Sequence, residues 1–143
     1  MGRYRTIKVG GKEYEALYTT RAMINIAEMC GGDLALLPEF MQKGSTIEQV
    51  ITISKLLAEL INGAIVARNA DIALGLADGE KKKLYSSDYF IDILNPFELS
   101  KAANDVMACM AVGTEFEKPK GITFEEVDED LKEIELEQLK EKN

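Results

Sequence analysis

The sequence contains no histidine and no tryptophan among its 143 residues. Without histidine, the chain lacks the most common general base and the most common transition-metal ligand in proteins. It also cannot form the Ser–His or Cys–His pairs that activate most nucleophiles. Without tryptophan, it lacks the indole surface on which sugars or bases stack. We therefore expect a protein that is not an enzyme and that has no cofactor or metal site.

Cysteine is also scarce, and long apolar runs are absent. Cys30 and Cys109 both lie within apolar helical patterns, so we expect two buried thiols in a reducing cytosol, with a disulfide as the alternative. The first residues, MGRYRTIKV, have no apolar run of the kind found in signal peptides. The longest apolar stretch, residues 47–67, is interrupted by charged side chains and suits a core helix better than a membrane span. These features predict a soluble cytoplasmic protein.

The sequence has fewer basic residues than acidic ones, 17 against 25. The net charge is −8 and the sequence pI is about 4.7. A chain with this balance repels phosphate backbones and anionic lipid surfaces, so we expect neither nucleic acid nor a membrane as a partner. The acidic residues are unevenly placed, because residues 115–143 have a net charge of −6 and residues 1–114 a net charge of −2.

The chain begins with the pattern of a β-hairpin. Apolar and polar residues alternate over residues 4–9, Gly10 and Gly11 form a two-residue turn signal, and the alternation returns over residues 12–18. A lone hairpin is marginally stable in water, so this one must pack on other elements. Its exposed edge could also pair with a second copy of the chain, which predicts self-association through the hairpin.

Helical patterns occupy most of the remaining chain. Thr19 or Thr20 begins one helix, a capping box at Ser45–Glu48 begins the longest, over residues 46–69, and Asn95 with Pro96 begins a third, which we expect to bury Phe97 and to stop at Gly113. Shorter helical pieces are expected over residues 33–41 and 89–94. The predicted fold is α+β and mostly α, with an N-terminal hairpin packed on a bundle of about four to five helices. We expect residues 1–113 to form this domain and residues 114–143 to form an acidic, hinged tail.

The tail has a pattern of its own. Pro119 to Gly121 are typical of a hinge, and a capping box at residues 123–126 precedes an apolar stripe. That stripe contains Val127, Leu131 and Ile134, and an isolated helix cannot bury it. The tail therefore either folds back on the domain or docks into a partner. Together with Met107 and Met110, which offer soft, adaptable side chains, these are the candidate partner-binding residues.

Two charged runs have simpler explanations than a ligand site. Counting from Asp128, an EF-hand would need glycine at its sixth position and a carboxylate at its twelfth, but Glu133 and Leu139 stand there. Three neighbouring lysines, Lys81 to Lys83, could bind a phosphate, but such a run is more often a solvated loop.

The order of elements resembles a known family. A hairpin of the form I-x-V-x-G-K-x-Y, with Ile7, Val9, Gly11, Lys12 and Tyr14, leads directly into TTRAMINIAE. This pattern, over roughly residues 6–112, resembles the tail assembly chaperones of long-tailed bacteriophages and of prophages in Gram-positive bacteria.

That resemblance implies a non-enzymatic role in the bacterial cytoplasm. Members of the family bind the tape-measure protein, help to recruit tail-tube subunits and are absent from the finished particle. The resemblance supplies no fixed binding residues. Three alternatives remain: a structural minor tail or connector protein, a small acidic adaptor module, and an enzyme that uses only carboxylates, lysine and tyrosine.

Overall fold

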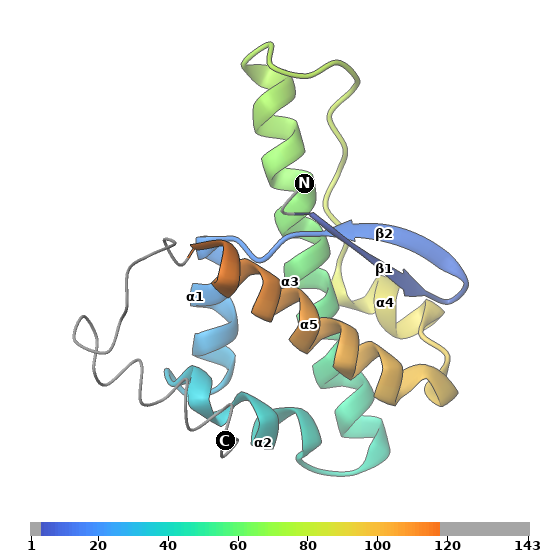
Figure 1. Ribbon diagram of the computed structural model, residues 1–143. Coiled ribbons are helices and arrows are strands. Elements are labelled where there is room, and N and C mark those ends of the chain that lie inside the picture. Colours follow the sequence, from blue (N-terminus) through green and yellow to red (C-terminus); the bar gives the residue numbers. More distant parts are fainter. Residues whose placement is uncertain (1–3, 118–143) are drawn as a thin grey trace, which may run out of the picture.

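The N-terminal hairpin forms as expected. The computed structural model (Figure 1) describes residues 4–117, with side-chain surroundings up to residue 111. Strand β1 (Arg5–Val9) pairs antiparallel with β2 (Lys12–Ala16). Gly10 and Gly11 connect them with φ angles of 60° and 84°, which glycine adopts without steric cost. One face of the hairpin enters the core and consists of Ile7, Val9, Tyr14 and Ala16.

Helices make up most of the described chain. In order they are α1 (Thr20–Met29), the 3₁₀ turn η1 (Leu34–Leu36), α2 (Leu37–Gln42), α3 (Thr46–Ala73), α4 (Ser87–Ile93), the 3₁₀ turn η2 (Pro96–Glu98) and α5 (Leu99–Glu117). Thr19 caps α1 by accepting the N–H of Ala22 at 3.0 Å, and Ser45 with Glu48 forms the capping box of α3. The predicted α+β, mostly α fold, with a hairpin on a bundle of helices, is confirmed.

Helix α3 is the centre of the core. It contacts α1, α2, α4, α5 and β2, and most of its residues from Ile53 to Ile65 are buried. By length and composition alone, this helix could cross a membrane, but 56% of its most apolar window is buried inside the fold. Such burial is what the core helix of a globular domain shows, because neighbouring elements surround it.

The chain between the hairpin and α1 crosses α3 at very close range. The N–H of Leu17 donates to the carbonyl oxygen of Leu60 at 2.9 Å. Gly63 permits this approach, since a Cβ atom at that position would lie 2.4 Å from the carbonyl oxygen of Leu17. The hairpin is thus held against α3 by backbone contact as well as by side-chain packing.

Two predicted helix ends are wrong. Helix α3 continues to Ala73, four residues past the expected end, and α5 continues through Gly113 to Glu117. A single glycine within a helix costs only about 1 kcal/mol, so it does not end one by itself. Helix α5 therefore crosses the expected boundary between residues 113 and 114.

The prediction that Phe97 is buried is also wrong, because its side chain is 96% exposed. Asn95 accepts the N–H of Phe97 at 2.9 Å and begins η2, not an α-helix. A 3₁₀ turn places residues at three per turn, so the apolar stripe of α5 does not extend backward onto Phe97. From Ala102 onward the stripe is as expected, with Val106 and Met110 buried.

Candidate partner-binding surface

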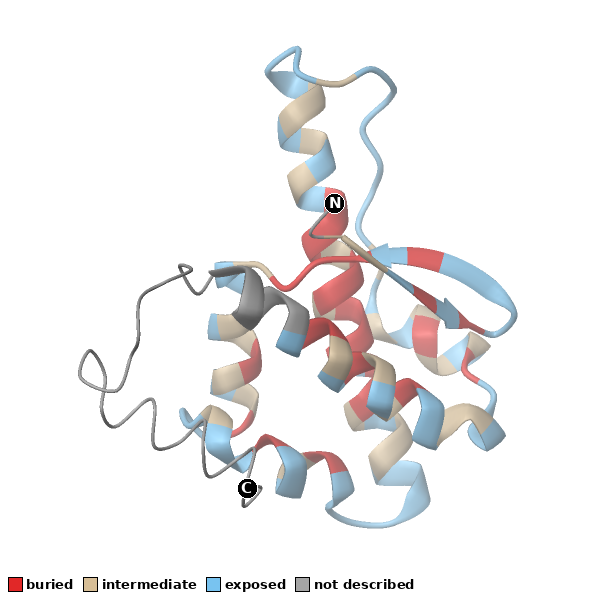
Figure 2. Cartoon of the chain, viewed as in Figure 1, coloured by how far each residue is buried: buried red, intermediate tan, exposed pale blue. Residues whose placement is uncertain are grey.

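One end of the molecule projects from the core. Beyond Ile65, no residue of α3 is buried and the helix leads into residues 74–84, and Figure 2 shows the change from buried to exposed along this helix. We call residues 66–84 the projecting end. Four of its apolar side chains are between 53% and 73% exposed, namely Val66, Leu74, Leu76 and Leu84. Exposed apolar side chains gathered in one region are typical of an interaction site.

Two asparagines of α3 hold the returning chain against the helix. The side chain of Asn69 donates to the carbonyl oxygen of Lys82 at 2.8 Å and accepts its N–H at 2.9 Å. Asn62 makes the same pair of bonds with Tyr85, both at 2.8 Å. Asn62 and Asn69 are seven residues apart on the helix, which is about 10 Å. Residues 82 and 85 are three residues apart, and an extended chain of that length spans nearly the same distance. Residues 82–85, which we call the strap, therefore run extended along α3.

Arg68 ties the hairpin to the projecting end. Its guanidinium donates to both carboxylate oxygens of Glu15, from Nε at 3.0 Å and from Nη2 at 2.6 Å. The ring of Tyr4 lies 3.9 Å from the guanidinium carbon, close enough for a cation–π contact. The hydrogen bond from Arg68 lowers the pKa of Glu15 below its usual value. These contacts fix the orientation of the hairpin relative to the C-terminal half of α3.

A groove of about 490 Å³ lies between β2, the projecting end and the strap. Its apolar lining includes Tyr14, Ile61, Ile65 and Tyr85, and its charged lining includes both acidic and basic side chains of β2 and residues 78–82. The Tyr14 hydroxyl is hydrogen-bonded to that of Tyr89 at 2.7 Å, and burial, with this bond, raises the pKa of Tyr14. Such a groove suits side chains of a polypeptide, because it combines apolar walls with a mixed polar rim.

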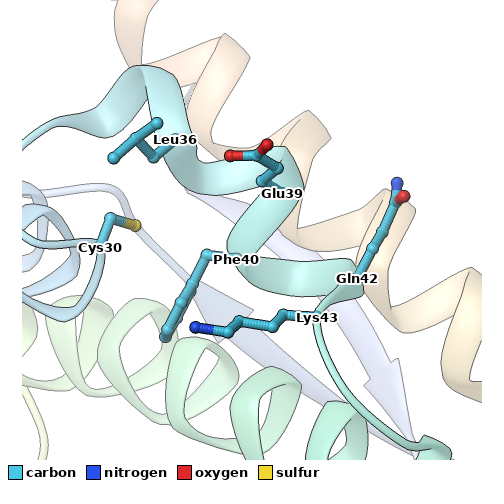
Figure 3. A pocket seen from close by; sticks show the side chains of 6 residues that line it. All are labelled: Cys30, Leu36, Glu39, Phe40, Gln42 and Lys43. Atoms are coloured by element: carbon cyan, nitrogen blue, oxygen red, sulfur yellow. The ribbon is translucent and has the colours of Figure 1, made fainter.

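A second hollow, of about 620 Å³, lies between the end of α1 and α2. Figure 3 shows the six residues that line it, which are Cys30, Leu36, Glu39, Phe40, Gln42 and Lys43. Burial and the nearby Asp33 raise the pKa of the Cys30 thiol. A thiol with a raised pKa is a poor nucleophile at neutral pH, so this hollow lacks an activated cysteine.

Both cysteines are free and buried, as expected. Burial raises the pKa of Cys109 to about 11. Within residues 4–117, no group of three or more Cys, Asp or Glu side chains is arranged to hold a metal ion.

The structure describes only two of the five candidate partner-binding residues. Met107 is 40% exposed on α5, whereas Met110 lies in the core and offers little surface to a partner. Val127, Leu131 and Ile134 lie outside the described residues. Pairing of the hairpin with a second copy stays a prediction.

Sequence reasoning did not single out the projecting end, although signals for it were present. The leucines of Leu74-Gly75-Leu76 stand among helix-breaking and charged residues, where no periodic partner can bury them. Leu84 directly follows the lysine run, so it too lacks a regular apolar stripe. Isolated leucines of this kind are candidates for contacts outside the fold.

Comparisons of the chain with models of protein families, with curated proteins and with solved structures found no match.

Proposed function

We propose that this protein is a non-enzymatic tail assembly chaperone of a bacteriophage or prophage. It binds the tape-measure protein and helps to recruit tail-tube subunits in the bacterial cytoplasm, and it is absent from the mature particle. The single observation that best supports a client-binding role is the projecting end, where four apolar side chains remain exposed.

The projecting end has the properties that a helical client requires. A long helical chain with apolar faces needs apolar surface on its chaperone to stay soluble. Burying a leucine side chain completely stabilises an interface by about 1.5–3 kcal/mol, before the entropic cost of association is subtracted. Leu74, Leu76 and Leu84, each more than half exposed, can together contribute several kcal/mol in this way.

Co-expression with the client tests this proposal. The partner is the candidate tape-measure protein, a very long helical chain that the proposed function places just downstream of this gene, and the readout is its solubility and co-purification. We expect the unaltered chain to keep it soluble, and the triple variant L74S/L76S/L84S to lose most of this effect. A matched control, I24S/I47S/F97S, removes three exposed apolar side chains that lie away from the projecting end and should retain the effect.

Three results would count against the proposal or against part of it. If the downstream protein stays insoluble and unbound in the presence of the unaltered chain, the chaperone function is wrong. If both variants lose binding equally, the chain can be a chaperone but the projecting end is not its binding site. Detection of the chain in purified phage particles would favour a structural tail or connector protein instead.

A further inference from the structure

The projecting end combines its exposed leucines with the longest basic run of the sequence. Lys81, Lys82 and Lys83 are all exposed, and Leu84 follows them directly. The bonds between Asn69 and the backbone of Lys82 fix this run beside α3. Residues 66–84 hold four basic and three acidic side chains, so the basic character is confined to the lysine run. A basic run beside exposed leucines fits a helix with an apolar stripe and acidic flanks.

The chain contains a segment with those properties. Residues 125–137 hold eight acidic residues and a single lysine, and the apolar stripe of Val127, Leu131 and Ile134 runs through them at helical spacing. The segment lies outside the described residues. Residues 1–114 have a net charge of only −2, and the lysine run is their longest basic stretch, so this run attracts the acidic segment more strongly than the surface around it.

We propose that residues 123–139 bind to the projecting end of the same chain. The acidic side chains face Lys81 to Lys83, and the stripe of Val127, Leu131 and Ile134 covers Leu74, Leu76 and Leu84. This contact does not depend on the identity of any client. A client that uses the same leucines must displace the segment, so the C-terminal segment competes with it.

The tether favours the same chain over a second copy. Residues 118–122 can extend over about 16 Å, and the following segment adds about 1.5 Å per residue where it is helical. The linker and a helical segment of residues 123–139 together span about 40 Å, about three times the radius of gyration of about 13 Å expected for a domain of this size, so the segment is long enough to lie on the projecting end. Tethering over a short linker gives an effective concentration in the millimolar range, which a separate copy does not match at ordinary protein concentrations.

Hydrogen exchange of the full-length chain tests the contact. We expect backbone amides of residues 123–139 to be protected, and the protection to fall about tenfold or more in K81E/K82E/K83E and in L74S/L76S/L84S. The control K8E/K43E/K55E makes the same change in net charge at three other exposed lysines and should leave the protection unchanged. Added salt should weaken the protection, since it screens surface charges.

Three outcomes would overturn the proposal. Residues 123–139 could exchange at the rate of an unprotected chain, which means that they bind nothing. The protection could be the same in all variants, which means that they bind elsewhere. It could instead rise with protein concentration, which assigns the contact to a second copy. Circular dichroism of each variant shows that the helical domain is retained, so a loss of protection reports on the contact itself.

Discussion

At the scale of single residues, Ser54 is the least expected feature of the core. It lies in the buried part of α3, and among the described residues its hydroxyl has no hydrogen-bond partner. A buried serine in a helix usually donates to the carbonyl four residues earlier. An unpaired buried hydroxyl has lost its bonds to water without replacing them, which costs about 1–3 kcal/mol.

Replacing Ser54 with alanine should therefore stabilise the protein. The substitution Ser54→Ala removes the unpaired hydroxyl and leaves a methyl group of nearly the same size, so we expect the free energy of unfolding to rise by about 1 kcal/mol. Chemical denaturation measures the change. Ser100→Ala, at an exposed position of α5, is the control and should have almost no effect. A loss of stability in Ser54→Ala would contradict this account of the hydroxyl.

The pair formed by Glu15 and Arg68 predicts a pH dependence. Because Arg68 lowers the pKa of Glu15, the contribution of this carboxylate to stability is present above its unfolded pKa and is lost as pH falls through its folded pKa. Both side chains are about half exposed, so the pair contributes at most about 1 kcal/mol.

We expect Glu15→Gln to lower the free energy of unfolding by about 0.5 kcal/mol at pH 7. The difference from the unaltered protein should disappear as pH falls through the lowered folded pKa of Glu15, because both proteins are then neutral at this position. Urea denaturation at several pH values measures it, and Glu13→Gln on the same strand is the control. A difference that persisted in acid would show that Glu15 acts through packing and not through its charge.

Some residues could be placed from the sequence because their role is local. Thr19 and Ser45 cap helices through bonds to backbone groups three residues away, and a short pattern contains all the necessary information. Phe97 could not be placed, since its exposure depends on whether the first turn is 3₁₀ or α. The partner of Glu15 also could not be predicted, because Arg68 lies 53 residues away.

At the scale of elements, the segment that follows β2 crosses α3 at Gly63. This crossing determines how closely the hairpin packs on the helix. In an ordinary exposed helix, changing glycine to alanine stabilises by about 1 kcal/mol. At Gly63 the added Cβ would lie 2.4 Å from the carbonyl oxygen of Leu17, and a backbone atom cannot move aside without shifting its segment.

We therefore expect Gly63→Ala to destabilise the protein, by about 1–3 kcal/mol, as overpacking usually does. The exchange of the Leu17 amide should also become faster, because its bond to Leu60 lengthens. Ala70→Gly, at an exposed site of the same helix, calibrates the effect of helix propensity alone. The sign of the change in the free energy of unfolding is decisive. A stabilised Gly63→Ala variant would mean that the backbones at Leu17 and Gly63 are not in close contact.

The existence of each element followed from its pattern, but some ends did not. The alternation in the hairpin and the capping box of α3 are strong local signals, and both elements begin where expected. The end of α3 was predicted at about Asn69. In the structure, Asn69 binds the backbone of Lys82, a partner that no local pattern predicts, and the helix continues for four more residues.

At the scale of the whole molecule, the candidate site lies where the core ends. The central part of α3 is surrounded by five elements and its last two turns are not (Figure 2). The sequence predicted a central helix, because its polar stripe is narrow. It could not predict which part of that helix is left uncovered, since this depends on how far the hairpin, α4 and α5 extend along it.

The way the strap is held allows its side chains to change in evolution without loss of the fold. Asn62 and Asn69 bind only backbone groups of residues 82 and 85, and every residue type except proline offers those same groups. The side chains at positions 81–84 are exposed and take no part in these hydrogen bonds. New preferences for a partner can therefore arise by substitution in this short segment while the scaffold stays intact, and the same positions are suitable for grafting a different recognition sequence.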